Sequence, residues 1–166
     1  MRRGFNPRVR WCILHGPRVA RTVPGTSVSN SVYIVEDHPR MRDLLREWID
    51  DLPGLSVCGT AESAETALRE LETVQADVAM IDMSLPMMGG IELVATLRER
   101  HPQTRCLILS GHNETSYVER ALAAGAQGYL LKGEPSEIRT AIDRMLAGER
   151  YLSTGLSDRS CNLSET

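Results

Sequence analysis

The sequence predicts an α/β domain built on a doubly wound, five-stranded parallel sheet. Five short apolar runs recur along the chain, and each is followed by a segment whose apolar residues have helical spacing. Unbroken apolar runs are typical of parallel strands that are buried on both faces. The helices between such strands cross over with a right-handed sense and cover both faces of the sheet, which gives the doubly wound arrangement.

The elements alternate regularly from residue 31 onward. The predicted strands are SVYIVE (31–36), LSVCGTA (55–61), DVAMID (77–82), RCLILS (105–110) and GYLL (128–131). In the first helical segment the apolar residues are Met41, Leu44, Leu45, Trp48, Ile49 and Leu52. Pro39 suits the first turn of this helix. The other helical segments are 64–74, 91–97, 117–122 and 138–146.

Charge and the extent of the regular pattern of strands and helices divide the chain into three parts. Its 166 residues, 42% hydrophobic and 25% charged, match one ordinary globular domain. Residues 1–30 contain six arginines and no acidic residue, so the remainder carries a formal charge of −9 within a total of −3. We therefore expect a basic extension at 1–30, a domain at 31–148 and a short C-terminal tail at 149–166.

The basic extension has no sustained helical or strand period and is expected to be disordered. An arm that contacts nucleic acid and an organelle-targeting peptide are both compatible with its arginines. Pro7, Pro17 and Pro24 would interrupt any amphipathic helix, however. We favour a dispensable extension over these two interpretations.

Neither a membrane segment nor a cysteine framework is predicted. No run approaches the roughly 18 apolar residues that a membrane span needs, and the N-terminus lacks the apolar core of a secretory signal. We expect a cytoplasmic protein. The four cysteines lie far apart, which favours neither a zinc site nor disulfides, and Cys58 and Cys106 are interpreted as core residues inside apolar runs.

Polar residues follow the predicted strands at the edge where ligands bind in doubly wound sheets. Glu36 and Asp37 end the first run, Asp82 the third and Ser110 the fourth, and Lys132 follows the fifth. Three carboxylates about 4 Å apart would repel by about 4 kcal/mol per pair at an effective dielectric constant near 20. A divalent cation and the ammonium group of Lys132 would balance them, and oxygen ligands with room for water favour Mg²⁺.

Lys132 is the only lysine of the chain, since the other 18 basic residues are arginine. A compact, flexible ammonium group is therefore interpreted as a specific requirement at this strand end. Each position has a simpler explanation when taken alone. Asp82 could be a turn aspartate before Pro86, and Glu36 and Asp37 could be charges that precede a helix. The presence of all these polar residues at one predicted edge of the sheet favours a functional site.

These residues resemble the receiver domains of bacterial two-component response regulators over 31–148. The resemblance rests on the pair Glu36-Asp37, on Asp82 followed by MSLPMMGG, on Ser110 and on GYLLK ending in Lys132. It implies a flavodoxin-like (β/α)5 fold with strand order 2-1-3-4-5. The segment AGERYLS (147–153) is similar to the end of receivers in the NarL/FixJ (LuxR-type) subfamily.

The resemblance also implies a role for each site residue. Asp82 would be the phosphoacceptor, which takes its phosphoryl group from a phosphohistidine of a sensor kinase. Lys132 and Ser110 would contact the phosphoryl oxygens, and Tyr129 would act as a switch that follows Ser110 inward. Mg²⁺ would be held by Glu36, Asp37, Asp82 and the main-chain carbonyl of Ser84. The chain would catalyse only its own phosphorylation and dephosphorylation and would not be an enzyme for other substrates.

Two other classes of protein were weighed against this interpretation. A haloacid-dehalogenase phosphatase also uses a strand-end aspartate and magnesium, but it needs a second aspartate where this chain has Ser84. A pseudo-receiver, an interaction module that is never phosphorylated, is disfavoured because the set Glu36, Asp37, Asp82, Ser110 and Lys132 is complete.

The resemblance implies partners of two kinds: a sensor histidine kinase, and a homodimer or effector on the side of the fourth and fifth helices. Only 16 residues follow Arg150, and they have no helical period or basic face, so DNA binding by this chain is not expected. Two interpretations stay open. The chain is either a stand-alone receiver or the receiver of a transcriptional regulator whose helix-turn-helix was lost.

Overall fold

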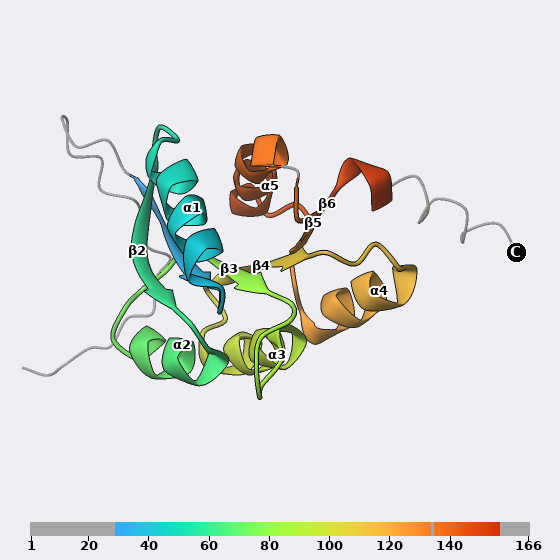
Figure 1. The fold of residues 1–166 in the computed structure, drawn as a ribbon, viewed down its shortest axis with the longest axis horizontal. Helices are drawn as coiled ribbons and strands as arrows, with labels where there is room; N and C mark the ends of the chain where they lie inside the picture. Colours follow the sequence, from blue (N-terminus) through green and yellow to red (C-terminus); the bar gives the residue numbers. More distant parts are fainter. Residues whose placement is uncertain (1–28, 134, 157–166) are drawn as a thin grey trace, which may run out of the picture.

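The parallel sheet is present with one strand more than predicted. The computed structural model describes residues 29–133 and 135–156. Its strands are β1 (Asn30–Val35), β2 (Leu55–Ala61), β3 (Val78–Asp82), β4 (Arg105–Ser110), β5 (Gly128–Leu131) and β6 (Tyr151–Leu152). All neighbouring pairs are parallel, and the order is β2-β1-β3-β4-β5-β6 (Figure 1). The predicted fold class and the order 2-1-3-4-5 are therefore confirmed.

Five helices cover the two faces of the sheet. Helices α1 (Pro39–Asp50) and α5 (Pro135–Leu146) lie on one face. Helices α2 (Ala64–Leu71), α3 (Gly90–Arg100) and α4 (Thr115–Ala124) lie on the other (Figure 1). Alternate residues of each strand point into the two layers, so that Ile34 packs with α1 and α5 while Tyr33 packs with α2 and α3. Pro39 stands in the first turn of α1, as predicted.

The core contains the cysteines that the sequence assigned to it. Cys106 is buried, and Cys58 is partly buried against the same apolar layer. In the part of the chain that the structure describes, no helix is long and apolar enough to cross a bilayer. The predictions for residues 1–28 fall outside the described residues, and the domain itself begins with β1 at Asn30.

The segment predicted as a short C-terminal tail at 149–166 contains an additional strand, β6, which the sequence analysis did not predict. Here the chain runs beside β5, where the backbone N–H of Tyr151 donates to Gln127 and that of Ser153 donates to Tyr129. The edge of β5 would otherwise expose unpaired backbone groups, which the added strand satisfies. A two-residue strand is too short to show a period in the sequence, so the pattern analysis had no signal for it.

Side chains also hold this segment, named here the β6 segment (residues 151–156). The Ser153 hydroxyl accepts from the N–H of Leu131 at 2.9 Å, and Leu156 is buried among the residues that pack under α4. The carboxylate of Glu137 in α5 accepts from the Thr154 hydroxyl at 2.6 Å and from its N–H at 3.3 Å. Desolvation raises the pKa of Glu137, but these hydrogen bonds outweigh it and hold the pKa below 4.5.

The turn between β3 and α3 allows the helix to begin directly against the strand. The N–H of Gly90 donates to the carbonyl of Met83 at 3.1 Å. A Cβ atom at Gly90 would overlap the carbonyl oxygen of Asp82 and crowd the Cα of Met83. The glycine is therefore required by the close approach of two backbones, not by an unusual dihedral angle.

Replacement of Gly90 by alanine should separate α3 from the end of β3. We expect Gly90→Ala to lower the free energy of unfolding by about 1–3 kcal/mol, the usual cost of overpacking. Gly111→Ala is the matched control, because a Cβ there meets nothing within 4 Å. Urea denaturation of both variants measures the difference. Equal stabilities would show that the backbone contact is not a constraint.

Loss of the Glu137 carboxylate should loosen the β6 segment. We expect Glu137→Ala to speed amide exchange at residues 151–154 about three- to tenfold, as for loss of one or two hydrogen bonds. Because the folded-state pKa is lowered, the carboxylate stabilises the segment at pH values above 4.5 and loses this effect as the pH falls below 4.5. Hydrogen exchange at pH 7 and pH 4, corrected for the intrinsic exchange rate at each pH, tests this prediction. Glu149→Ala is the control, because it removes an exposed carboxylate. A segment equally protected in both variants would contradict the interpretation.

Candidate functional site

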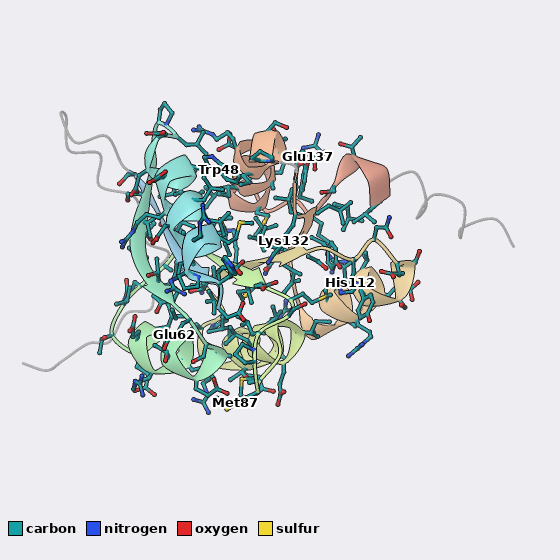
Figure 2. The ribbon with its side chains drawn as sticks, in the orientation of Figure 1. Trp48, Glu62, Met87, His112, Lys132 and Glu137 are labelled. Carbon is teal, nitrogen blue, oxygen red and sulfur yellow. The ribbon has the colours of Figure 1, made fainter. Side chains whose placement is uncertain are left out.

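The strand ends bring together the polar residues that the sequence placed there. In the sheet register Val35 lies beside Ile81, Asp82 beside Leu109, and Ser110 beside Leu131. The residues that follow these strands therefore meet at one edge. Glu36, Asp82, Ser110 and Lys132 all lie at this edge, as predicted, and Figure 2 shows Lys132 near the middle of the molecule.

Three carboxylates form a cluster at this edge. Glu36 and Asp82 are buried, with 1% and 4% of their surface exposed, while Asp37 is exposed. One oxygen from each lies within 4.8 Å of the others, and in the described residues this is the one group of acidic, histidine or cysteine side chains that could share a metal ion. The predicted cluster of Glu36, Asp37 and Asp82 is therefore present.

Backbone groups hold the buried carboxylates. The N–H of His38 donates to Glu36 Oε1 at 3.4 Å, and the N–H of Ser84 donates to Asp82 Oδ1 at 3.2 Å. The guanidinium group of Arg42 donates to the carbonyl of Glu36 at 2.7 Å, a contact that sequence patterns did not indicate. The two N–H contacts orient the acidic side chains without neutralising them, and Arg42 holds the main chain at Glu36.

Lys132 joins two of the carboxylates. Its Nζ lies 3.0 Å from Glu36 Oε2 and 3.0 Å from Asp82 Oδ2. Burial lowers the pKa of Lys132, but the hydrogen bonds and the charges of the two carboxylates outweigh it, and the pKa is raised above 10.5. Burial and the charge of Asp82 raise the pKa of Glu36 against the opposing effect of Lys132. The ammonium group is therefore the charge that allows two buried carboxylates to lie side by side.

The cluster remains two charges short of neutral when all four groups are ionised. Its ligands are hard oxygens close enough to share one ion, and the exposure of Asp37 leaves one side open to water, which is the environment that Mg²⁺ prefers. The residues thus fit a magnesium ion. The main-chain carbonyl of Ser84 as a further ligand stays a prediction; the contact that the structure describes for this residue is its N–H to Asp82.

Ser110 and Tyr129 lie next to the cluster, joined through the backbone of His112. The Ser110 Oγ accepts from the N–H of His112 at 2.9 Å, and the Tyr129 hydroxyl donates to the carbonyl of His112 at 2.9 Å. Tyr129 is fully buried, so its side chain already occupies the inward position in this structure. Burial raises the pKa of its hydroxyl, and the Ser110 hydroxyl opposes this shift.

Met83 is a second residue of the site, after Arg42, that sequence patterns did not indicate. The sulfur of Met83, which follows Asp82 directly, lies 3.6 Å from Ser110 Oγ and 3.7 Å from the Tyr129 hydroxyl. An apolar residue after a strand carries no signal of such a position, because methionine is common in cores. Only its place beside Asp82 could have drawn attention to it.

Removal of the Lys132 charge should destabilise the carboxylate cluster. We expect Lys132→Met to lower the free energy of unfolding at pH 7 by about 1–3 kcal/mol, since two buried carboxylates lose their cation. The loss should shrink as the pH falls, because Glu36 has a raised pKa and takes up a proton more readily in the folded state. Urea denaturation at several pH values measures both effects.

Arg144→Met is the matched control for this substitution. Arg144 lies 4.0 Å from Glu149 in a pair whose side chains are both more than half exposed. Such pairs contribute about 0–1 kcal/mol, so this variant should remain close to wild type at every pH. A Lys132→Met variant as stable as the control would contradict the importance of the buried pairing.

Comparisons with known proteins agree with the fold. Residues 32–143 match the family model of the response regulator receiver domain. The chain is 32% identical over 130 residues to the response regulator UvrY of Escherichia coli (strain K12) and 33% identical over 128 residues to its nitrate/nitrite response regulator protein NarL. These alignments cover 78% and 76% of this chain, but only 60% and 59% of the two relatives.

Solved structures of response regulators have the same fold. A two-component response regulator of the LuxR family from Aurantimonas sp. SI85-9A1 superposes with a TM-score of 0.78 at 32% identity, over 81% of this chain and 97% of that one. The isolated REC domain of RcsB from Salmonella enterica serovar Typhimurium, at 22% identity and a TM-score of 0.73, shares the fold over 78% of this chain and 97% of its own. The matched model, the relatives and the geometry of the strand ends agree that this chain belongs to the response regulator receiver domain family, with homologues of the LuxR type.

Proposed function

We propose that the chain is a phosphorylatable switch of a two-component system, in which Asp82 accepts a phosphoryl group from the phosphohistidine of a sensor kinase in the cytoplasm. The observation that carries this proposal is the position of Lys132, 3.0 Å from both Glu36 and Asp82, beside carboxylates that could share a metal ion. The ammonium group, together with a divalent cation held by the carboxylates, would offset the negative charge that phosphorylation adds at Asp82.

In the proposed reaction, a carboxylate oxygen of Asp82 attacks the phosphorus atom of the phosphohistidine. The new P–O bond forms an acyl phosphate while the P–N bond breaks and its electron pair stays on the imidazole nitrogen. Lys132 meets the added charge on the phosphoryl oxygens, and the N–H of Ser84 keeps the carboxylate oriented. Magnesium held by Glu36, Asp37 and Asp82 would neutralise charge on the transferred group.

The response to phosphorylation would pass through Ser110. Its hydroxyl would turn to donate to a phosphoryl oxygen, and the N–H of His112 that now donates to Ser110 would move with it. The carbonyl of His112 accepts from Tyr129, so the loop between β4 and α4 and the aromatic side chain would respond together. A differential free energy of about 5.5 kcal/mol would move such an equilibrium from 1:99 to 99:1.

The proposed partners are a sensor histidine kinase and a second copy or an effector on the face of α4 and α5. The β6 segment lies near this face, because Leu156 belongs to the apolar cluster that includes Val118 of α4, and Thr154 is held by Glu137 of α5. We propose that the chain acts on no substrate beyond its own acyl phosphate. Structures of RcsB include complexes with DNA, but we propose no DNA contact for the residues described in this chain.

The first test is phosphorylation by a small donor. With Mg²⁺ and acetyl phosphate, the wild-type chain should gain about 80 Da, the mass of one phosphoryl group, as a hydroxylamine-labile adduct. Asp82→Ala should gain none, and chelation of the metal by EDTA should prevent labelling. Intact-mass spectrometry measures the adduct.

Asp143→Ala controls for the loss of one carboxylate, because Asp143 lies in an exposed pair with Arg139 on α5. It should be labelled like wild type. The absence of an adduct in wild type, together with no change on addition of beryllofluoride, would overturn the proposal in favour of a pseudo-receiver. Labelling that survives Asp82→Ala would assign the phosphoryl group to another residue.

A further inference from the structure

The thioether of Met83 lies where a redox change would act directly on the switch residues. Met83 follows Asp82, and its sulfur is within 3.7 Å of two hydroxyl groups, those of Ser110 and Tyr129. A thioether sulfur is a weak hydrogen-bond acceptor. The Ser110 hydroxyl is therefore held only loosely on this side and can turn toward Asp82 at low cost.

The hydroxyl protons of Ser110 and Tyr129 have different acceptors. The Tyr129 hydroxyl has one proton, which goes to the carbonyl of His112 at 2.9 Å rather than to the more distant sulfur. The Ser110 Oγ accepts from the N–H of His112, and its own proton has two acceptors within reach, the Met83 sulfur at 3.6 Å and the oxygen of the Tyr129 hydroxyl. The strength of the Met83 acceptor therefore contributes to how firmly the Ser110 hydroxyl stays in its present direction.

The Met83 side chain borders a groove that is open to solvent. Met83 is only partly buried, and it lines an open groove of about 450 Å³ between α3 and α4 together with Ser84, His112 and Tyr117. Met87, at 86% exposure on the loop between β3 and α3, is more accessible still and takes no part in the hydrogen bonds that join the switch residues (Figure 2). The chain therefore contains an accessible methionine at the site and an accessible one outside it.

We propose that Met83 is a site of reversible oxidation, and that its sulfoxide holds Ser110 away from Asp82. A sulfur lone pair attacks one oxygen of a peroxide such as hydrogen peroxide, the O–O bond breaks, and the other oxygen leaves as water after proton transfer. Sulfur is oxidised by two electrons and the peroxide is reduced. The product is a polar S=O group in place of the thioether.

The present spacing suits the sulfoxide as an acceptor. In a sulfoxide the S=O bond is about 1.5 Å long, and a hydrogen bond places the hydroxyl oxygen about 2.7 Å from the sulfoxide oxygen. With an angle of about 120° at the sulfoxide oxygen, the sulfur lies about 3.7 Å from the hydroxyl oxygen. Ser110 Oγ already lies 3.6 Å from the sulfur. The strong acceptor would thus capture the Ser110 hydroxyl without moving the backbone, and a phosphoryl group on Asp82 would lose this donor. This inference rests on the proposed function of Asp82 as the phosphoacceptor.

The test compares phosphorylation before and after mild peroxide treatment. Oxidation of Met83, followed by peptide mass mapping, should lower the fraction labelled at limiting acetyl phosphate about three- to tenfold, the change expected for loss of one hydrogen bond. Treatment with methionine sulfoxide reductases should restore it. Each variant is compared with its own untreated sample, so differences in basal labelling do not matter.

Two variants separate Met83 from other oxidisable residues. Met83→Leu should keep the same labelling with and without peroxide, although its cysteines and other methionines are unchanged. Met87→Leu should remain as sensitive as wild type. Sensitivity that persists in Met83→Leu, or that disappears in Met87→Leu, would overturn the proposal.

A second measurement does not depend on phosphorylation. The amide proton of His112 donates to Ser110 Oγ, so its NMR chemical shift should change when Met83 is oxidised and should not change in peroxide-treated Met83→Leu. If untreated wild type takes up no phosphoryl group, the proposed function fails while this shift still tests the capture of Ser110. An oxidised Met83 with an unchanged His112 shift, or a Met83 that resists peroxide while Met87 reacts, would overturn the inference itself.

Discussion

Two buried carboxylates side by side at the end of a parallel sheet are the constraint on which the site depends. Burial and the charge of Asp82 raise the pKa of Glu36, and the Lys132 ammonium, 3.0 Å from both carboxylates, makes their ionised forms compatible. With Asp37 added, the cluster still has an excess of negative charge. An arrangement that one lysine only partly neutralises is suited to a divalent cation, because the positive charge of the ion offsets the excess negative charge.

Main-chain groups do much of the positioning around this cluster. The N–H of Ser84 orients Asp82, and the N–H and carbonyl of His112 tie Ser110 to Tyr129. The missing Cβ of Gly90 lets α3 begin against the carbonyl of Asp82. Because the hydroxyls of Ser110 and Tyr129 contact the main chain of His112, a rotation of the Ser110 hydroxyl can move the loop between β4 and α4. A conformational switch needs such a coupling.

Strand β5 connects the site to the surface of the molecule. It carries Tyr129, it leads into Lys132, and its backbone pairs on the outer side with the β6 segment. The carbonyl of Tyr129 accepts from Ser153, and the N–H of Leu131 donates to the same residue. A displacement of β5 would therefore reach residues 151–156 directly. The chain spans about 60% of the length of the curated relative UvrY.

The sequence by itself determined the fold class, the strand order implied by its resemblance, and the membership of the site. Apolar runs and helical spacing report burial, and parallel strands must gather Glu36, Asp82, Ser110 and Lys132 at one edge. Tertiary structure alone decided the sixth strand and the hydrogen bonds between Glu137 and Thr154. It also decided the close backbone approach that requires Gly90, and the position of the Met83 sulfur near two hydroxyl groups. Each of these is a contact between backbone or side-chain atoms whose distance depends on how elements pack, and no period or residue type in a linear sequence encodes that distance.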